Sequence, residues 1–159
     1  MSENIKIRDH PTEEEGYIIP KHYTEGKFQL IDIMEESLSL EAFSGWCKGI
    51  ILKYIIRTDS KNNLRNFTKA KYYLDELISF RNEKEKIAEE HIKPSYYNST
   101  SIETIEVIED KLPEEELLGF YQGMVIRYIT RSSYKGHFLD DLVKAKYYLD
   151  RLIEHLKNK

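Results

Sequence analysis

The sequence predicts an all-α protein in which two tandem three-helix repeats pack as a pseudo-twofold helical domain. The heptapeptide KAKYYLD occurs twice, at Lys69–Asp75 and at Lys144–Asp150. Apolar residues around it recur at the i, i+3, i+4, i+7 spacing of amphipathic helices, and no stretch shows the alternation typical of a strand. Because an exact repeat with two adjacent tyrosines indicates duplication, the whole chain is best divided by its internal repeat.

The two copies align from a proline onward, over 20–80 and 94–156, with one residue inserted near Gly136–His137. Prolines, tyrosines, glycines and arginines match along the alignment. We therefore divide the chain into a polar N-terminal arm, repeat 1, a charged helical connection and repeat 2, with the bounds 1–19, 20–80, 81–93 and 94–159.

The first two helices of each repeat follow from their sequence patterns. A short acidic helix is expected at Leu30–Glu36 and at Ile102–Asp110. The second helix is expected at Leu40–Arg57 and from Pro113 to Arg131, where proline suits the first helical position and the glutamates after it suit the helix dipole. In repeat 1 its apolar face consists of Phe43, Trp46, Cys47, Ile50, Ile51 and Tyr54.

The third helix of each repeat contains KAKYYLD. Its apolar stripe consists of Phe67, Ala70, Leu74, Leu77 and Ile78 in repeat 1, and of Leu142, Ala145, Leu149, Leu152 and Ile153 in repeat 2. The stretch after Phe80 is rich in helix-forming residues, so we expect this helix to continue into the connection until Pro94 stops it.

Composition limits the classes of function. The net charge is −4, which argues against a partner of duplex nucleic acid, because such a partner requires a basic surface. Cys47 is the only cysteine, no apolar run is long enough for a membrane span, and the N-terminus has no apolar signal segment. We therefore expect a cytoplasmic protein, with no membrane partner and no disulfide within the chain.

A stripe of glycines and cations runs along the second helix of both repeats. Residues four apart share a helix face, and the stripe consists of Gly45, Gly49, Lys53 and Arg57 and of Gly119, Gly123, Arg127 and Arg131. An interior glycine costs a helix about 1 kcal/mol, so we expect either another helix or a ligand to approach the backbone here.

The cations at the end of this stripe are candidate phosphate ligands, through charge-assisted hydrogen bonds. Arg57 and Arg131 come first, followed by Lys53 and Arg127, then by Lys69 and Lys144 of the heptapeptide; Lys61 and Lys135 lie in the turns between. The alternative is that these cations only complement the helix dipole.

Tyrosines supply candidate stacking groups for a base. Tyr23 and Tyr97 follow a proline in loop context, and Tyr72 and Tyr147 lie in the heptapeptide. Since Tyr72 and Tyr73 are consecutive, at most one of each such pair can face the core, and an amphipathic surface tyrosine is the equally simple alternative.

The sequence carries no phosphate-binding glycine loop of either common type, no histidine pair at metal-ligand spacing and no catalytic triad. We assign no catalytic and no metal-binding residues, and expect no cofactor. Carboxylates on the short first helices, such as Glu35 and Glu109, are expected to be solvated, and magnesium is expected only if the protein is a kinase.

Motifs of repeat 1 resemble a bacteriophage family of short helical domains. They are Pro-x-His-Tyr, Ile-Asp-Ile-Met-Glu, Phe-Ser-Gly-Trp-Cys-Lys-Gly, Leu-Lys-Tyr-Ile-Ile-Arg and Lys-Ala-Lys-Tyr-Tyr-Leu. That family includes a nucleotide kinase that acts on nucleoside monophosphates, and most of its members are of unknown function. The resemblance covers both repeats and implies a nucleotide ligand and a phage setting.

The chain departs from the family pattern at polar positions. Ile50 and Met124 stand where the family tends to have Asn, and Asn66 stands where it has the Asp that Asp141 retains. Eroded polar positions in a duplicated chain favour a binder over a catalyst. The paired cations of a pseudo-twofold unit suit a twofold ligand such as a cyclic dinucleotide.

Three functions follow as expectations. The first is a phage-type protein that sequesters a signalling nucleotide, similar to a cyclic dinucleotide, and so blunts bacterial antiviral immunity. The second is a nucleoside monophosphate kinase, and the third is a non-catalytic helical interaction module. We also expect a homo-oligomer, because so small a helical body has much apolar surface to cover.

Overall fold

The computed structural model describes residues 29–57, 63–85, 104–134 and 136–158. Within these ranges the chain is helical and contains no strand, which confirms the all-α prediction. The helices are α2 (Leu30–Ser37), α3 (Leu40–Ile56), α4 (Asn63–Glu85), α5 (Thr104–Lys111), α6 (Glu114–Arg131) and α7 (Phe138–Lys157). Each repeat therefore supplies three helices in the same order.

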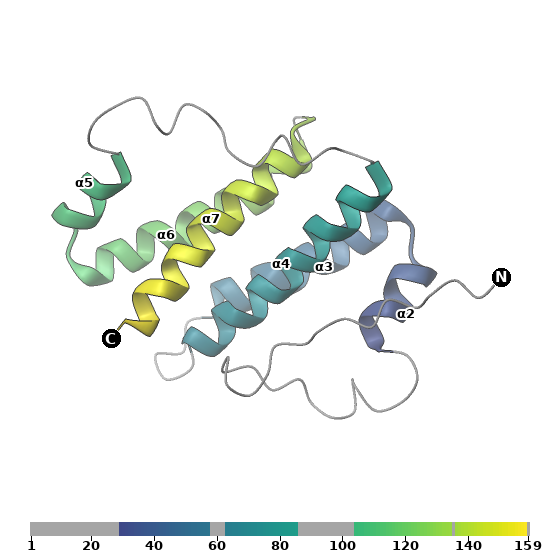
Figure 1. Cartoon of the computed structure of the whole chain (residues 1–159), viewed down its shortest axis with the longest axis horizontal. Coiled ribbons are helices and arrows are strands. Elements are labelled where there is room, and N and C mark those ends of the chain that lie inside the picture. Colours follow the sequence, from purple (N-terminus) through teal and green to yellow (C-terminus); the bar gives the residue numbers. More distant parts are fainter. Residues whose placement is uncertain (1–28, 58–62, 86–103, 135, 159) are drawn as a thin grey trace.

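The four long helices form a bundle, and the two short ones flank it. Helices α4 and α7 run side by side, with α3 and α6 behind them, while α2 and α5 lie at opposite ends of the molecule (Figure 1). Each repeat contributes a helical hairpin, α3 with α4 and α6 with α7, and the hairpins pack against one another through α4 and α7 and through α3 and α6.

The core lies between the two hairpins and is shared by both repeats. All five residues of the predicted stripe of α7 are buried, and in α4 only Ile78 of the predicted five is partly exposed. In α3 the residues Phe43, Cys47 and Ile51 are fully buried, whereas Trp46 and Tyr54 lie at the edge of the core. These helices therefore bury the faces that the apolar spacing predicts.

The repeated heptapeptides meet across the α4–α7 interface. Lys71 Nζ lies 2.7 Å from Asp150 Oδ1, and Lys146 Nζ lies 2.5 Å from Asp75 Oδ1. Each lysine also contacts the aspartate of its own helix, so the four side chains form one network, which we call the ion quartet. The exchange is reciprocal because the two helices are antiparallel copies of one sequence. One lysine and one aspartate of each heptapeptide therefore have a shared role at this interface.

Contacts between α3 and α6 show that these helices are antiparallel too. Lys48 Nζ donates a hydrogen bond to Ser133 Oγ, just beyond the C-terminal end of α6. Gln122, at the position of repeat 2 that aligns with Lys48, donates to the carbonyl oxygen of Ile55 near the C-terminal end of α3. The C-terminal ends of α3 and α6 therefore lie at opposite ends of the bundle.

Helix ends differ slightly from the predicted bounds. Pro113 precedes α6 as its N-cap residue and is not its first helical residue. Helix α4 is described as far as Glu85, and its predicted continuation to Pro94 lies outside the described residues, as does the N-terminal arm. None of the described helices is both long enough and apolar enough to cross a membrane.

Candidate anion-binding site

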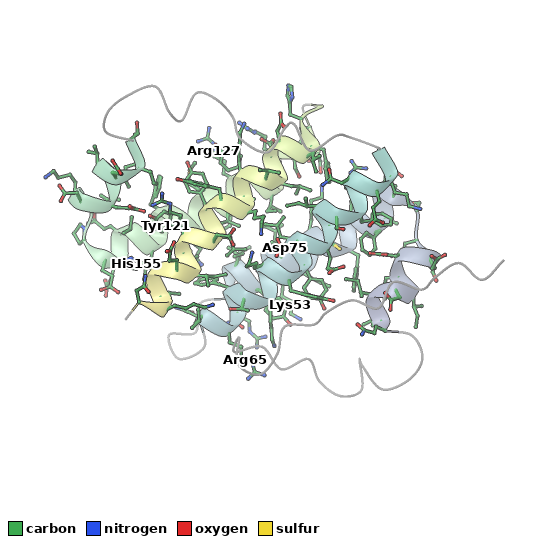
Figure 2. All side chains as sticks on the ribbon, in the orientation of Figure 1. Lys53, Arg65, Asp75, Tyr121, Arg127 and His155 are labelled. Atoms are coloured by element: carbon green, nitrogen blue, oxygen red, sulfur yellow. The ribbon has the colours of Figure 1, made fainter. Side chains whose placement is uncertain are left out.

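Four cationic side chains gather where α3 ends and α4 begins. Lys53 and Arg57 come from the end of α3, and Arg65 and Lys69 come from the first two turns of α4. Figure 2 shows Lys53 and Arg65 at the same edge of the molecule. We call these four residues the repeat-1 cationic cluster. Three of them are exposed to solvent, and Lys69 is half-buried.

An aromatic ring joins the two helices inside this cluster. Lys53 Nζ lies 5.4 Å and Lys69 Nζ 5.2 Å from the centre of the Tyr54 ring. Cations within about 6 Å of a ring centre are attracted by its quadrupole, so the Tyr54 ring helps to hold two ammonium groups close together.

The charges of the cluster act on one another. Burial lowers the pKa of Lys69 below the ordinary lysine value, and the positive charges of Arg65, Lys53 and Arg57 lower it further. A lysine next to uncompensated cations binds its proton less tightly, and an anion placed among them reverses that effect. This local excess of positive charge is present although the whole chain is acidic.

Asn66 forms a hydrogen bond at the end of α3 and carries no charge, so it does not neutralise the cluster. Its side-chain nitrogen donates to the carbonyl oxygen of Arg57 over 3.3 Å, and the Asn66 residue is 9% exposed. Among the described residues, no carboxylate forms an ion pair with Lys53, Arg57 or Arg65. The turn 58–62, which contains the predicted candidate Lys61, lies outside the described residues.

The aligned position in repeat 2 holds an ion pair instead. Arg131 donates from Nε to Asp141 Oδ2 over 3.0 Å and from a terminal nitrogen to Asp141 Oδ1 over 2.5 Å. Asp141 is only 1% exposed, and Arg131 is half-buried. Arg131, a predicted phosphate ligand, therefore donates two hydrogen bonds to a buried carboxylate. At the position where repeat 1 has the cation Arg65, repeat 2 has Asp140.

A tyrosine ring lies among cations in repeat 2 as well. Arg131, Lys144 and Arg127 approach the centre of the Tyr128 ring to 5.0, 5.8 and 6.0 Å. That ring stacks on Tyr148, with 12° between the planes. Repeat 2 therefore keeps the ring and three cations, but it adds two carboxylates that repeat 1 does not have at the aligned positions.

The two groups of cations lie at opposite sides of the bundle. Lys53 and Arg65 lie at one edge in Figure 2 and Arg127 at the other, as the antiparallel arrangement of α3 and α6 requires. The predicted ligands Arg57 and Arg131 are therefore not brought together in one pocket.

The glycine stripe faces open space. A Cβ atom added at any of the four helical glycines would meet no atom within 4 Å, leaving aside the helix's own backbone, and all four residues are exposed. The interpretation that another helix of this chain packs on the stripe is wrong for the described residues. A ligand or a second copy of the chain as its occupant stays a prediction.

The tyrosine candidates have different surroundings. In repeat 2 Tyr148 is buried while Tyr147 is 37% exposed, so one member of this adjacent pair faces the core. In repeat 1 Tyr72 is half-buried, and its ring meets that of Tyr73 edge to face. The loop candidates Tyr23 and Tyr97 lie outside the described residues.

The carboxylates of the short helices are not all solvated. Glu109 accepts a hydrogen bond from the Tyr121 hydroxyl and forms an ion pair of 2.7 Å with Arg151, which ties α5 to α6 and α7. Burial and this hydrogen bond raise the pKa of Tyr121 above the ordinary tyrosine value. Among the described residues, no group of His, Cys, Asp and Glu side chains could hold a metal ion.

Three parts of this arrangement were not predicted from the sequence. Arg65 was not among the predicted ligands, although it precedes Lys69 by four residues, the spacing that also relates Lys53 to Arg57. The ion quartet was not predicted either, because it forms between two helices and the sequence of one heptapeptide does not indicate its partner. The sequence shows that Asn66 departs from the family pattern, which Asp141 retains. It does not show that these two residues lie beside Arg57 and Arg131.

The fold and the site define a duplicated all-α protein with a cationic cluster in one copy. The model of a family described as "protein of unknown function (DUF3310)" matches residues 19–75 and 92–150. The chain belongs to this family, and the two matches confirm the tandem duplication. No curated protein and no solved structure matches the chain. The resemblance to a nucleotide kinase stays a prediction.

Proposed function

We propose that the chain binds a signalling nucleotide without converting it, and that the repeat-1 cationic cluster holds the phosphates. Sequestering such a nucleotide would withdraw it from bacterial antiviral immunity, as expected of a phage-type protein. The observation that carries the proposal is the concentration of four cations where α3 ends and α4 begins, two of them over the Tyr54 ring. An asparagine stands there where repeat 2 has an aspartate that pairs with the arginine.

The chemistry of the cluster suits a phosphate more than a carboxylate. Two guanidinium groups offer planar pairs of donors, and two ammonium groups offer compact charges. Phosphate oxygens accept such hydrogen bonds in a charge-assisted, partly bidentate way. The side chains are exposed or half-buried, so a ligand can reach them without any rearrangement of the core.

The geometry favours one ligand on one repeat. A small ligand cannot contact both Arg57 and Arg131, because the C-terminal ends of α3 and α6 lie at opposite ends of the bundle. A cyclic dinucleotide therefore fits this proposal only if a single cluster binds it. The proposal that the ligand is not converted rests on the polar positions at which the chain departs from the family pattern, Ile50, Met124 and Asn66.

Calorimetric titration of the full chain with mononucleotides and with cyclic di- and trinucleotides tests the proposal. The ligand is recovered afterwards and checked by chromatography. We expect one site per chain, intact ligand, and about a tenfold or greater loss of affinity in Arg57→Ala and in Arg65→Ala, because each removes charge-assisted hydrogen bonds.

Lys84→Ala is the matched control, because it removes one exposed positive charge in the last turn of α4, at the end of that helix opposite to the cluster. Equal affinities in Arg57→Ala, Arg65→Ala and Lys84→Ala would overturn the proposed site. Recovery of a phosphorylated nucleotide after addition of a nucleoside triphosphate and magnesium would establish the kinase instead. If no nucleotide binds, the non-catalytic helical interaction module is the remaining one of the three expected functions.

A further inference from the structure

We infer that the repeat-1 cationic cluster is built for two phosphate groups of one ligand, and that each group is held by one pair of cations. The inference rests on the proposed function, since it assumes a ligand that carries phosphate. It adds the number of phosphates and the residues that each of them contacts, and it limits this capacity to one of the two repeats.

The cluster divides into two pairs, each with one member from α3 and one from α4. The first pair is Lys53 and Lys69, whose ammonium groups both lie over the Tyr54 ring. The second pair is Arg57 and Arg65. Arg57 follows Lys53 by one helical turn, and Arg65 precedes Lys69 by one turn on the antiparallel helix.

The spacing of the pairs indicates two phosphates. Positions four residues apart on a helix are separated by about 6 Å along its axis. A single phosphate that contacts one pair therefore leaves most of the charge of the other pair uncompensated. The second pair lies close enough to act on the first, because both of its arginines lower the pKa of Lys69. A second anionic group beside it removes that repulsion.

Repeat 2 retains only the first of these pairs. Arg127 and Lys144 lie beside the Tyr128 ring, as Lys53 and Lys69 lie beside Tyr54. The second pair is replaced, because Asp140 stands where repeat 1 has Arg65 and the remaining arginine is bound by Asp141. The chain thus contains both a two-pair and a one-pair version of the same hairpin.

Two kinds of ligand carry two phosphate groups. The phosphates can be joined directly, as in a diphosphate, or separated by sugars, as in a cyclic dinucleotide. Calorimetry with inorganic phosphate, pyrophosphate and cyclic di-AMP, at constant ionic strength, separates them. We expect at least one of the two bivalent ligands to bind about tenfold tighter than phosphate or better, and the tighter one identifies the source.

Double variants of the full chain assign the pairs. Arg57→Gln with Arg65→Gln removes the second pair, and Lys53→Gln with Lys69→Gln removes the first. Each double variant should bind the bivalent ligand only as tightly as it binds phosphate. Phosphate should still bind, because one pair of cations remains in each variant. Lys84→Gln with Lys111→Gln is the matched control, because both of these lysines are exposed and lie in the last turns of α4 and α5, outside the cluster.

Two results would overturn the inference. One is equal binding of phosphate and both bivalent ligands to the natural chain, and the other is a double variant of either pair that behaves like the control. If phosphate binds and each double variant weakens its binding, the cluster is one site for a single phosphate. That result would also overturn the inference of two phosphates. If neither these anions nor the nucleotide panel binds, the proposed function falls as well.

Discussion

The two repeats place an arginine at the same position and use it differently. Arg131 lies against the buried carboxylate of Asp141, so it belongs to the framework of the α6–α7 hairpin. Arg57 lies at the exposed end of α3, where Asn66 contacts its backbone and not its guanidinium group. The neighbouring residue differs accordingly: Asp141 pairs with the Arg131 guanidinium group, whereas Asn66 leaves the Arg57 side chain exposed.

A second comparison concerns the surface between the repeats, where the copies remain equivalent. In the ion quartet each lysine contacts both aspartates, and each repeat contributes one lysine and one aspartate. The interface therefore uses the duplicated residues of both copies in the same way. The hairpin ends differ between the copies, because Arg65 and Asn66 of repeat 1 correspond to Asp140 and Asp141 of repeat 2.

The largest expected effect is on stability, and it separates the two arginines. Arg131→Ala should lower the free energy of unfolding by about 3 kcal/mol, because it leaves the buried carboxylate of Asp141 without its partner. Arg57→Ala should change it by less than about 0.5 kcal/mol, as is usual for an exposed residue. Urea denaturation followed by circular dichroism measures both, and equal losses would show that the two arginines do not have different roles.

The next effect is on ligand affinity, and it converts one repeat into the other. Arg65→Asp with Asn66→Asp gives repeat 1 the residues of repeat 2 at the aligned positions. The new carboxylates should bind Arg57 as Asp141 binds Arg131, and we expect about a 100-fold loss of affinity for the best nucleotide of the panel. Calorimetry measures the loss.

The reciprocal variant is the control for that experiment. Asp140→Arg with Asp141→Asn gives repeat 2 the residues of repeat 1, and the stoichiometry should rise from one ligand per chain to two. A repeat-1 variant that keeps full affinity would show that the aspartate and asparagine do not distinguish the copies.

Fold and site differ in how far the sequence predicts them. The predicted bounds of α3 and α6 agree with the structure to within one residue. The helices that contain KAKYYLD were predicted from an apolar stripe whose spacing is visible in the chain. The α7 stripe, which ends at Leu152 and Ile153, is wholly buried. The duplication was visible as well, since KAKYYLD is preserved letter by letter.

The site was predicted only in part, because its chemistry depends on contacts between helices. Lys53, Arg57 and Lys69 follow from their spacing, but the buried partner of Arg131 lies ten residues away on the next helix. No periodicity within one helix indicates such a pair. The exposed glycine stripe was ambiguous for the same reason, since the sequence does not show what lies opposite Gly49.

The ion quartet tests where the repeats are equivalent. Asp75→Asn and Asp150→Asn should each lower the free energy of unfolding by about 1 kcal/mol, a modest value because the side chains are 32–44% exposed. The double variant should cost less than the sum, since both aspartates contact the same lysines. Denaturation at low and high salt measures this, and a marked difference between the two single variants would break the equivalence.

The glycine stripe provides a smaller test of whether the copies share a free surface. Gly49→Ala and Gly123→Ala should each stabilise the chain by up to about 1 kcal/mol, because alanine favours the helix and its Cβ meets no neighbour. Thermal denaturation, together with sedimentation, measures this effect. A loss of stability that depends on protein concentration would show that a second copy packs on the stripe, and would support the expected homo-oligomer.

The smallest expected effect is the pH dependence of binding at Lys69. Because burial and the neighbouring cations lower its pKa, Lys69 loses its proton at a lower pH than an ordinary lysine. Affinity for the phosphate ligand should therefore fall as the pH rises through that value, by about twofold at the pH where half of the Lys69 is neutral. Lys69→Arg should abolish this fall, because a guanidinium group stays charged.

The stability of the chain without ligand should change with pH in the opposite direction. The unfolded chain holds the Lys69 proton more tightly, so the free energy of unfolding rises with pH between the lowered and the ordinary pKa. Calorimetry and urea denaturation across that range measure the two trends, and a fall in affinity that persists in Lys69→Arg would assign it to another group.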